Sequence, residues 1–219
     1  MGEFVQASYR GSAAVLGIAF INNIYGSSVI APLMILGTVP LYNILAVVTL
    51  SITGPNSQGL SRKTLKKTCI GILKNPIIWG IFLGMIPALL RIQFPEIIQK
   101  TIGNIANLAT PLALIGLGAG FEGKKALAMI KPTIVCTFTR LFAQCLVFLP
   151  IAVFMGFRGE KLVALLIMLG APTTVSCYIM AKNMGHEGTL TSSVVVATTF
   201  FSSISLTLWL FVMRSLGFI

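Results

Sequence analysis

Apolar stretches of about twenty residues recur along this chain, separated by short polar connections. A helix of that length crosses the hydrocarbon core of a bilayer, whereas a membrane β-barrel would alternate apolar and polar residues over about ten positions. Hydrophobic residues make up 56% of the 219 residues and charged residues 10%, which excludes a water-soluble domain. The sequence therefore predicts an all-α integral membrane protein with about seven transmembrane helices. The predicted spans are Phe4–Ile24, Ser28–Ile52, Cys69–Leu90, Ile98–Phe121, Ala128–Phe157, Leu162–Lys182 and Leu190–Phe218.

The lysines and arginines are distributed unevenly between the two ends of these spans. One end holds Arg10, Arg62, Lys63, Lys66, Lys67, Lys74, Lys124, Lys125, Lys131 and Lys182, and the other holds Arg91, Lys100, Arg158, Lys161 and Arg214. Because basic connections stay in the cytoplasm, the first end is predicted to be cytoplasmic. We expect a multi-pass protein of the plasma membrane with loop 53–68 inside and the carboxyl terminus outside. Orientation accounts for the net charge of +11 without a nucleic-acid partner.

One predicted span contains a strong break, at Gly170-Ala171-Pro172-Thr173-Thr174-Val175-Ser176. A break inside a bilayer is tolerated only where the freed backbone groups meet protein, water or a solute. The segment is therefore a candidate binding site, with hydroxyl donors from Thr173, Thr174 and Ser176. The alternative is that Pro172 kinks a packed helix whose hydroxyl groups bond to its own backbone.

A similar weak point lies in the first span, where Arg10-Gly11-Ser12 precedes Gly17. Transporters built from inverted repeats carry interrupted helices at matching positions of the two halves, and substrate binds where they meet. If the first span matches the sixth and the second matches the seventh, residues 1–52 are the last two helices of a first repeat. Residues 53–68 then form a loop, and residues 69–219 form a complete five-helix second repeat. About three further helices, roughly 90–100 residues, are expected upstream.

Other polar residues within the spans have two interpretations each. Arg140 is a candidate counter-charge for an anion, or an anchor near the cytoplasmic interface. Asn107 and Thr110 share a helix face and could line a transport pathway or join helices by hydrogen bonds. The four cysteines have no metal-site or disulfide spacing, and the single histidine, His186, is interpreted as a solvated loop residue. No metal or other cofactor is expected.

Several segments resemble the auxin efflux carrier family, also called the membrane transport family. The resemblance covers nearly the whole chain and is carried by segments in the family's order and spacing: Phe4 to Gly17, Val39 to Val47, Leu73-Lys74-Asn75-Pro76, Ala109 to Leu114, Ala171-Pro172-Thr173-Thr174 and Ala181-Lys182. In two places the chain departs from the family pattern. Ser12 stands where asparagine is usual, and Ala19 stands where the family has the proline of the first crossing, so the first break is expected to be less sharply unwound.

The resemblance implies a ten-helix fold of two inverted five-helix repeats, as in bile-acid symporters and sodium–proton antiporters, with this chain lacking the first three helices. It also implies a secondary carrier (permease or efflux carrier) of a small organic anion such as malate, working by alternating access. The expected substrate-binding residues are Ser12, Gly17, Asn107, Thr110, Pro172, Thr173, Thr174 and Ser176. The expected partners are the organic anion and membrane lipid; a coupling proton or sodium ion and a homodimer are compatible with this interpretation.

The residues present give less support to other functions. A seven-helix receptor or sensor matches the helix count, but the charge distribution places its amino terminus inside. An intramembrane enzyme would need a nucleophile with its base, or metal ligands, and the spans contain neither histidine nor carboxylate. A channel remains open as an alternative, although no ring of charges suggests a filter.

Overall fold

The computed structural model describes residues 1–13, 17–26, 30–54, 70 and 76–219. Apart from one isolated β-bridge, the regular structure in this part of the chain is helical, as predicted. In chain order the elements are α1 (Gly2–Tyr9), α2 (Ile18–Tyr25), α3 (Ile30–Thr53), α5 (Pro76–Leu89), α6 (Glu96–Ala119), α7 (Gly123–Ala128), α8 (Ile130–Phe138), the π-helical turn η2 (Thr139–Ala143), α9 (Gln144–Phe154), α10 (Gly159–Gly170), α11 (Ser176–Asn183) and α12 (Thr189–Ser215).

Four helical stretches of the described residues are long and apolar enough to cross a membrane: Pro32–Thr53, Glu96–Ala119, Ile130–Phe154 and Thr189–Ser215. Two other predicted spans are divided into short helices, α1 with α2 and α10 with α11. The remaining predicted span, Cys69–Leu90, is described mainly as the 14-residue helix α5. The structure thus supports membrane-spanning helices in the described residues without establishing the count of seven.

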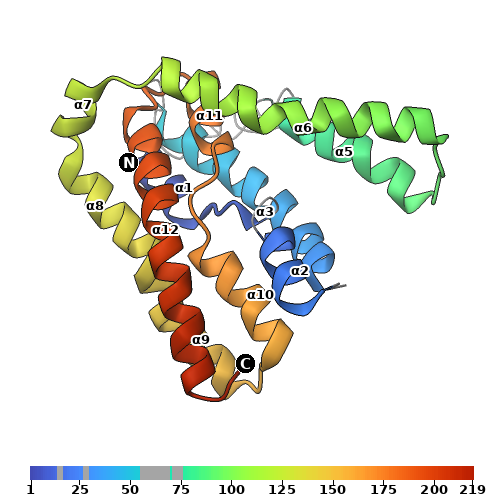
Figure 1. The fold of residues 1–219 in the computed structure, drawn as a ribbon. Coiled ribbons are helices and arrows are strands. Elements are labelled where there is room, and N and C mark those ends of the chain that lie inside the picture. The colour runs from blue at the N-terminus through green and yellow to red at the C-terminus, as the bar shows by residue number, and fades with distance from the viewer. Residues whose placement is uncertain (14–16, 27–29, 55–69, 71–75) are drawn as a thin grey trace.

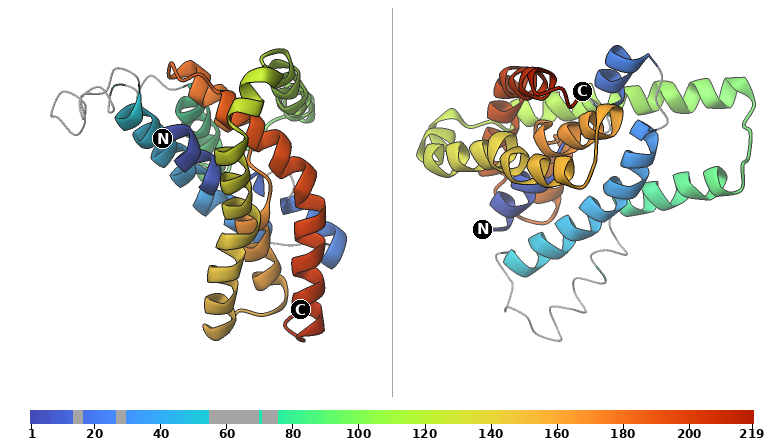
Figure 2. Two further views of the ribbon diagram at one scale, coloured as in Figure 1. Left: turned by 90° about the vertical axis from the view of Figure 1, so that its left-hand side faces the viewer. Right: turned by 90° about the horizontal axis from the view of Figure 1, so that it is seen from below.

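The short helices α1 and α10 run towards each other from opposite ends of the molecule (Figure 1). Helix α1 begins beside the start of α12, where Glu3 accepts from the Gly188 and Thr191 amides, whereas α10 begins beside the carboxyl terminus. Helix α8, the turn η2 and helix α9 follow one another in one long stretch, and α12 lies beside it (Figures 1 and 2). Helix α12 contacts both α1 and α10, α8 contacts α1, and α9 contacts α10. This arrangement places the carboxyl ends of α1 and α10 close together in the interior.

Two apolar clusters fix the position of α10. One joins it to α2 and α3 through Ile21, Met34 and Ile167, and the other joins it to α9 and α12 through Leu149 and Leu206. In a bilayer the lipid tails are as apolar as these side chains, so the clusters hold the helices together through close van der Waals packing. Helix α10 therefore packs between α2 and α3 in one cluster and α9 and α12 in the other.

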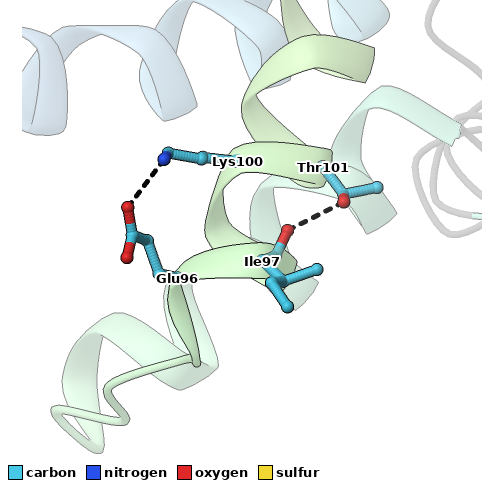
Figure 3. Close-up of polar contacts among 4 residues, drawn as sticks. All are labelled: Glu96, Ile97, Lys100 and Thr101. Atoms are coloured by element: carbon cyan, nitrogen blue, oxygen red, sulfur yellow. Dashed lines mark hydrogen bonds and ion pairs between the residues drawn. The ribbon is translucent and has the colours of Figure 1, made fainter.

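Helices α5 and α6 extend to one side of the rest of the molecule (Figures 1 and 2). Helix α6 contacts α11 near its own carboxyl end, where Leu117 packs with Tyr178. Its first turns are exposed, and there Lys100 pairs with Glu96 at 2.6 Å while the Thr101 hydroxyl donates to the Ile97 carbonyl at 2.8 Å (Figure 3). Such an exposed ion pair adds little stability, so α6 is held by its far end.

Several loop predictions can be compared with the described residues. Most of the predicted loop 53–68, with its basic cluster, lies outside them, as do Cys69 and Ser27. Cys136, Cys145 and Cys177 are buried free thiols, in agreement with their interpretation as small core residues. His186 corrects the prediction of a solvated residue, because it is partly buried and its Nε2 lies 3.0 Å from the Leu50 carbonyl in the last turn of α3.

Candidate functional site

The two predicted helix breaks meet in the interior of the molecule. Gly11 and Thr173 form an antiparallel β-bridge. Beside it, the Ser12 amide donates to the Pro172 carbonyl at 2.8 Å, and the Thr174 amide donates to the Arg10 carbonyl at 3.3 Å. Each break therefore supplies backbone partners for the other, which is the condition for an interrupted helix within a bilayer. The predicted meeting of the two breaks is confirmed, and the place where Gly11 pairs with Thr173 is the crossing of the two interrupted helices.

The first span is interrupted in the structure even though Ser12 and Ala19 depart from the family pattern. Helix α1 ends at Tyr9, and Arg10 has the extended backbone angles φ −81° and ψ 102°. The freed carbonyl groups of α1 find partners on the second half of the chain: Ala7 accepts from the Thr173 hydroxyl at 2.8 Å, and Ser8 accepts from Gln144 Nε2 at 2.9 Å. These tertiary contacts replace the helical hydrogen bonds at the end of α1.

Arg140 binds the carboxyl ends of both interrupted helices. It lies in the π-helical turn η2 and is only 1% exposed. Its Nε donates to Ala171 O at 2.8 Å, Nη2 to Met168 O at 2.8 Å and Nη1 to Tyr9 O at 3.0 Å. Since the carboxyl end of a helix carries a partial negative charge, the guanidinium offsets two such ends at once. The side chain thus points into the protein instead of extending from its surface.

Arg10 is a second buried arginine at the crossing, although the sequence analysis also counted it among the basic residues at the cytoplasmic end of the spans. It is 3% exposed. Its Nη2 donates to Asn43 Oδ1 at 2.8 Å and to Ser176 Oγ at 2.9 Å, and Nη1 lies 3.3 Å from Met180 Sδ. An arginine directly before a Gly-Ser break in an otherwise apolar stretch is the signal that could have identified it.

The crossing carries positive charge without a carboxylate partner. The five acidic residues of the chain are all glutamates. Glu3 binds the amino end of α12, accepting from the amides of Gly188 and Thr191, and the two ion pairs found among the described residues are Glu96–Lys100 and Glu122–Lys125. None of the described hydrogen bonds or ion pairs joins a glutamate to Arg10 or Arg140. Of the two guanidinium groups, that of Arg140 is bound to helix-end carbonyls, whereas that of Arg10 lies beside Ser176 at the amino end of α11, where an anion is favoured.

The predicted site residues divide into two groups. Ser12, Pro172, Thr173, Thr174 and Ser176 all lie at the crossing. Within this group Thr173 is buried, and its hydroxyl donates to the Ala7 carbonyl of α1. Thr174 and Ser176 are half-buried, and their hydroxyl oxygens lie 3.2 Å apart.

The structure does not bring the other three to the crossing. Gly17 is packed where a Cβ would lie 3.2 Å from Met34 Cε and 3.3 Å from Ile167 Cγ2, so it serves close helix contact. Asn107 and Thr110 are exposed on α6, which contacts the rest of the molecule near its carboxyl end. Helical spacing correctly placed these two on one helix but could not show which element the helix packs against.

A buried glutamine also belongs to this region and was missed. Gln6 is completely buried, and its Nε2 donates to the Cys177 carbonyl at 3.1 Å. Its Oε1 has no hydrogen-bond partner among the described residues. The sequence analysis did not select Gln6, although a buried amide normally marks a polar contact between helices.

A further observation is the similarity of the chain to known proteins. The family model described as membrane transport protein matches residues 4–210, a range that includes both interrupted helices. A search of curated proteins gives no match.

Proposed function

Since this chain belongs to the membrane transport protein family, we propose that it is a secondary active transporter that moves a small organic anion across the plasma membrane by alternating access. The single observation that carries this proposal is the crossing of two interrupted helices at Gly11 and Thr173 beside two buried arginines. Interrupted helices that meet in the bilayer are the usual substrate site of inverted-repeat transporters.

The electrostatics of the crossing favour an anion over a cation. Arg10 and Arg140 are buried with neutral hydrogen-bond acceptors among the described residues. Burying an unpaired charge costs several kcal/mol, and a bound carboxylate would offset part of that cost. A cation exchanger would instead need an intramembrane carboxylate. A carboxylate of about the size of malate is therefore the proposed substrate class, coupled to a proton or a sodium ion.

An inverted repeat is supported by the order of elements on the two sides of the crossing. The first side contains short helix α1, a break, short helix α2 and long helix α3, and the second contains α10, a break, α11 and long helix α12. Helices α1 and α10 approach the crossing from opposite ends, and the bridge between the breaks is antiparallel. These features favour two halves of opposite orientation within the proposed ten-helix fold.

The test is uptake of radiolabelled malate by proteoliposomes with and without an imposed proton or sodium gradient. Saturable uptake that accumulates malate when a gradient is present would support the proposal. Flux that is non-saturable and independent of both gradients would favour a channel, and absence of flux for malate and related carboxylates would refute the carrier.

A matched pair of variants links the activity to the crossing. We expect Pro172→Ala to abolish saturable uptake, because Pro172 lies within the second break, beside Thr173, and its carbonyl accepts from the Ser12 amide. Pro150→Ala is the control, since Pro150 lies within the continuous helix α9 and is exposed. Unchanged kinetics in the Pro172 variant would remove the crossing as the transport site.

A further inference from the structure

The two buried arginines of the crossing have hydrogen-bond partners of different kinds. All three nitrogens of the Arg140 guanidinium donate, to three backbone carbonyls and to Gln144 Oε1 at 3.0 Å. A Cβ added at Gly11 would overlap Arg140 Nη2 and would lie 2.9 Å from Cζ, so the chain leaves no free space on that side. Arg140 therefore cannot turn towards a ligand without leaving helix-end carbonyls unpaired, which is costly inside a protein.

Arg10 is bound only to neutral side-chain acceptors in the described contacts. These are the Asn43 amide oxygen, the Ser176 hydroxyl and the Met180 thioether, of which the sulfur is a weak acceptor. A carboxylate accepts two parallel hydrogen bonds from a guanidinium and binds it more strongly than neutral groups do. An anion can therefore replace these contacts with a net gain, which is not available at Arg140.

The partners of Arg10 also connect it to the accessible side of the crossing. Ser176 is the first residue of α11 and, like Thr174, is half-buried, whereas Arg10 itself is 3% exposed. Asn43 is held by its Nδ2, which donates to the Val39 carbonyl at 2.8 Å, so its oxygen faces Arg10 in a fixed position. A ligand that contacts Ser176 would therefore reach Arg10 by displacing one hydroxyl group.

From this difference we infer that Arg10 is the residue that binds the carboxylate of the substrate and selects anions over neutral analogues, whereas Arg140 is a positioning residue that holds the two broken helices together. The inference rests on the proposed transport function. Ser176 and Asn43 orient the Arg10 guanidinium in the absence of substrate. Removing the charge at position 10 should therefore alter selectivity, and removing it at position 140 should alter the fold.

The test compares binding and uptake of malate with those of malamide, in which both carboxylates are replaced by neutral amides. Acetate, lactate and citrate extend the panel. Binding is measured on the purified protein as a ligand-dependent rise in the unfolding midpoint, and uptake is measured in proteoliposomes. We expect Arg10→Gln to weaken malate binding by at least about tenfold, as for loss of a charged hydrogen bond, and to leave little preference for malate over malamide.

Two further variants control for folding. Arg10→Lys keeps the charge and should retain preference for malate with a raised KM, and Arg214→Gln removes an exposed arginine from α12 and should behave as wild type. Wild-type binding of carboxylates with the same affinity and selectivity in Arg10→Gln would overturn the role of Arg10 while leaving the carrier function in place. If the wild type binds and transports no carboxylate of the panel, both proposals are refuted. Loss of selectivity in Arg10→Gln but not in Arg10→Lys supports the inference even if Arg10→Gln is less stable, since a folding defect lowers binding of all ligands alike.

Discussion

Replacing Arg140 by lysine tests whether one side chain joins the two interrupted helices. The substitution keeps the buried charge, so the desolvation cost is nearly unchanged, but it loses the forked geometry of the guanidinium. Arg140 serves four acceptors: the carbonyls of Tyr9, Met168 and Ala171, and the amide oxygen of Gln144. A lysine ammonium has a single nitrogen and can reach about two of them. Each buried acceptor left unpaired costs about 1–3 kcal/mol, which gives a loss of about 2–6 kcal/mol.

For a chain of this length, 1 kcal/mol corresponds to a shift of about 2–4 °C, so the unfolding midpoint should fall by about 4–24 °C. A thiol-reactive fluorescent dye can follow this transition, because Cys136, Cys145 and Cys177 are fully buried and become reactive on unfolding. Arg214→Lys is the matched control, since that arginine is exposed. A midpoint for Arg140→Lys within about 2 °C of the wild type would refute the assigned role, because it would correspond to less than one unpaired acceptor.

Three further substitutions probe the same region and its boundary. Gly11→Ala should lower the unfolding midpoint because the new Cβ displaces the guanidinium from its carbonyls, whereas Gly37→Ala meets nothing within 4 Å and should not; equal midpoints would contradict the packing described. Thr173→Val should cost about 1–3 kcal/mol in thermal unfolding by leaving a carbonyl of α1 unpaired, and Thr173→Ser should restore most of it; no difference between the two would exclude the hydroxyl. Glu3→Gln should cost about 0.5–2 kcal/mol in the same assay by weakening the cap of α12, whereas Glu96→Gln, in an exposed pair, should cost less than about 0.5 kcal/mol; the reverse order would be incompatible with the contacts.

The sequence predicted the candidate site in part because interruptions are visible as residue types. Glycine, proline and hydroxyl residues at 170–176, and Arg10-Gly11-Ser12, cannot continue an apolar lipid-facing helix without partners, and both segments are breaks in the structure. Matching the two breaks also predicted correctly that they meet. The structure does not bring Gly17, Asn107 and Thr110 to the crossing, because their positions depend on which helices pack together. That information is absent from local spacing, since one helix face can cover either a site or another surface.

Proline content alone did not determine where a helix would break. The structure retains prolines inside continuous helices at Pro40, Pro87, Pro111 and Pro150. At Pro172 the chain is extended instead, because its carbonyl is taken by the Ser12 amide and that of Ala171 by the Arg140 side chain. The local chemistry permits a break at each of these positions, and the partners from distant segments decide which one forms.

The sequence by itself determined that this chain is helical and suited to a membrane, because apolar stretches of about twenty residues have no other stable form there. It also marked the two segments that could not remain regular. Only the tertiary structure decided that Arg10 is a buried group rather than a loop residue, and that Arg140 points inward. The reason is that an arginine is stable inside the protein only where distant segments supply its acceptors, and Asn43, Ser176 and the helix-end carbonyls come together only when the two halves cross.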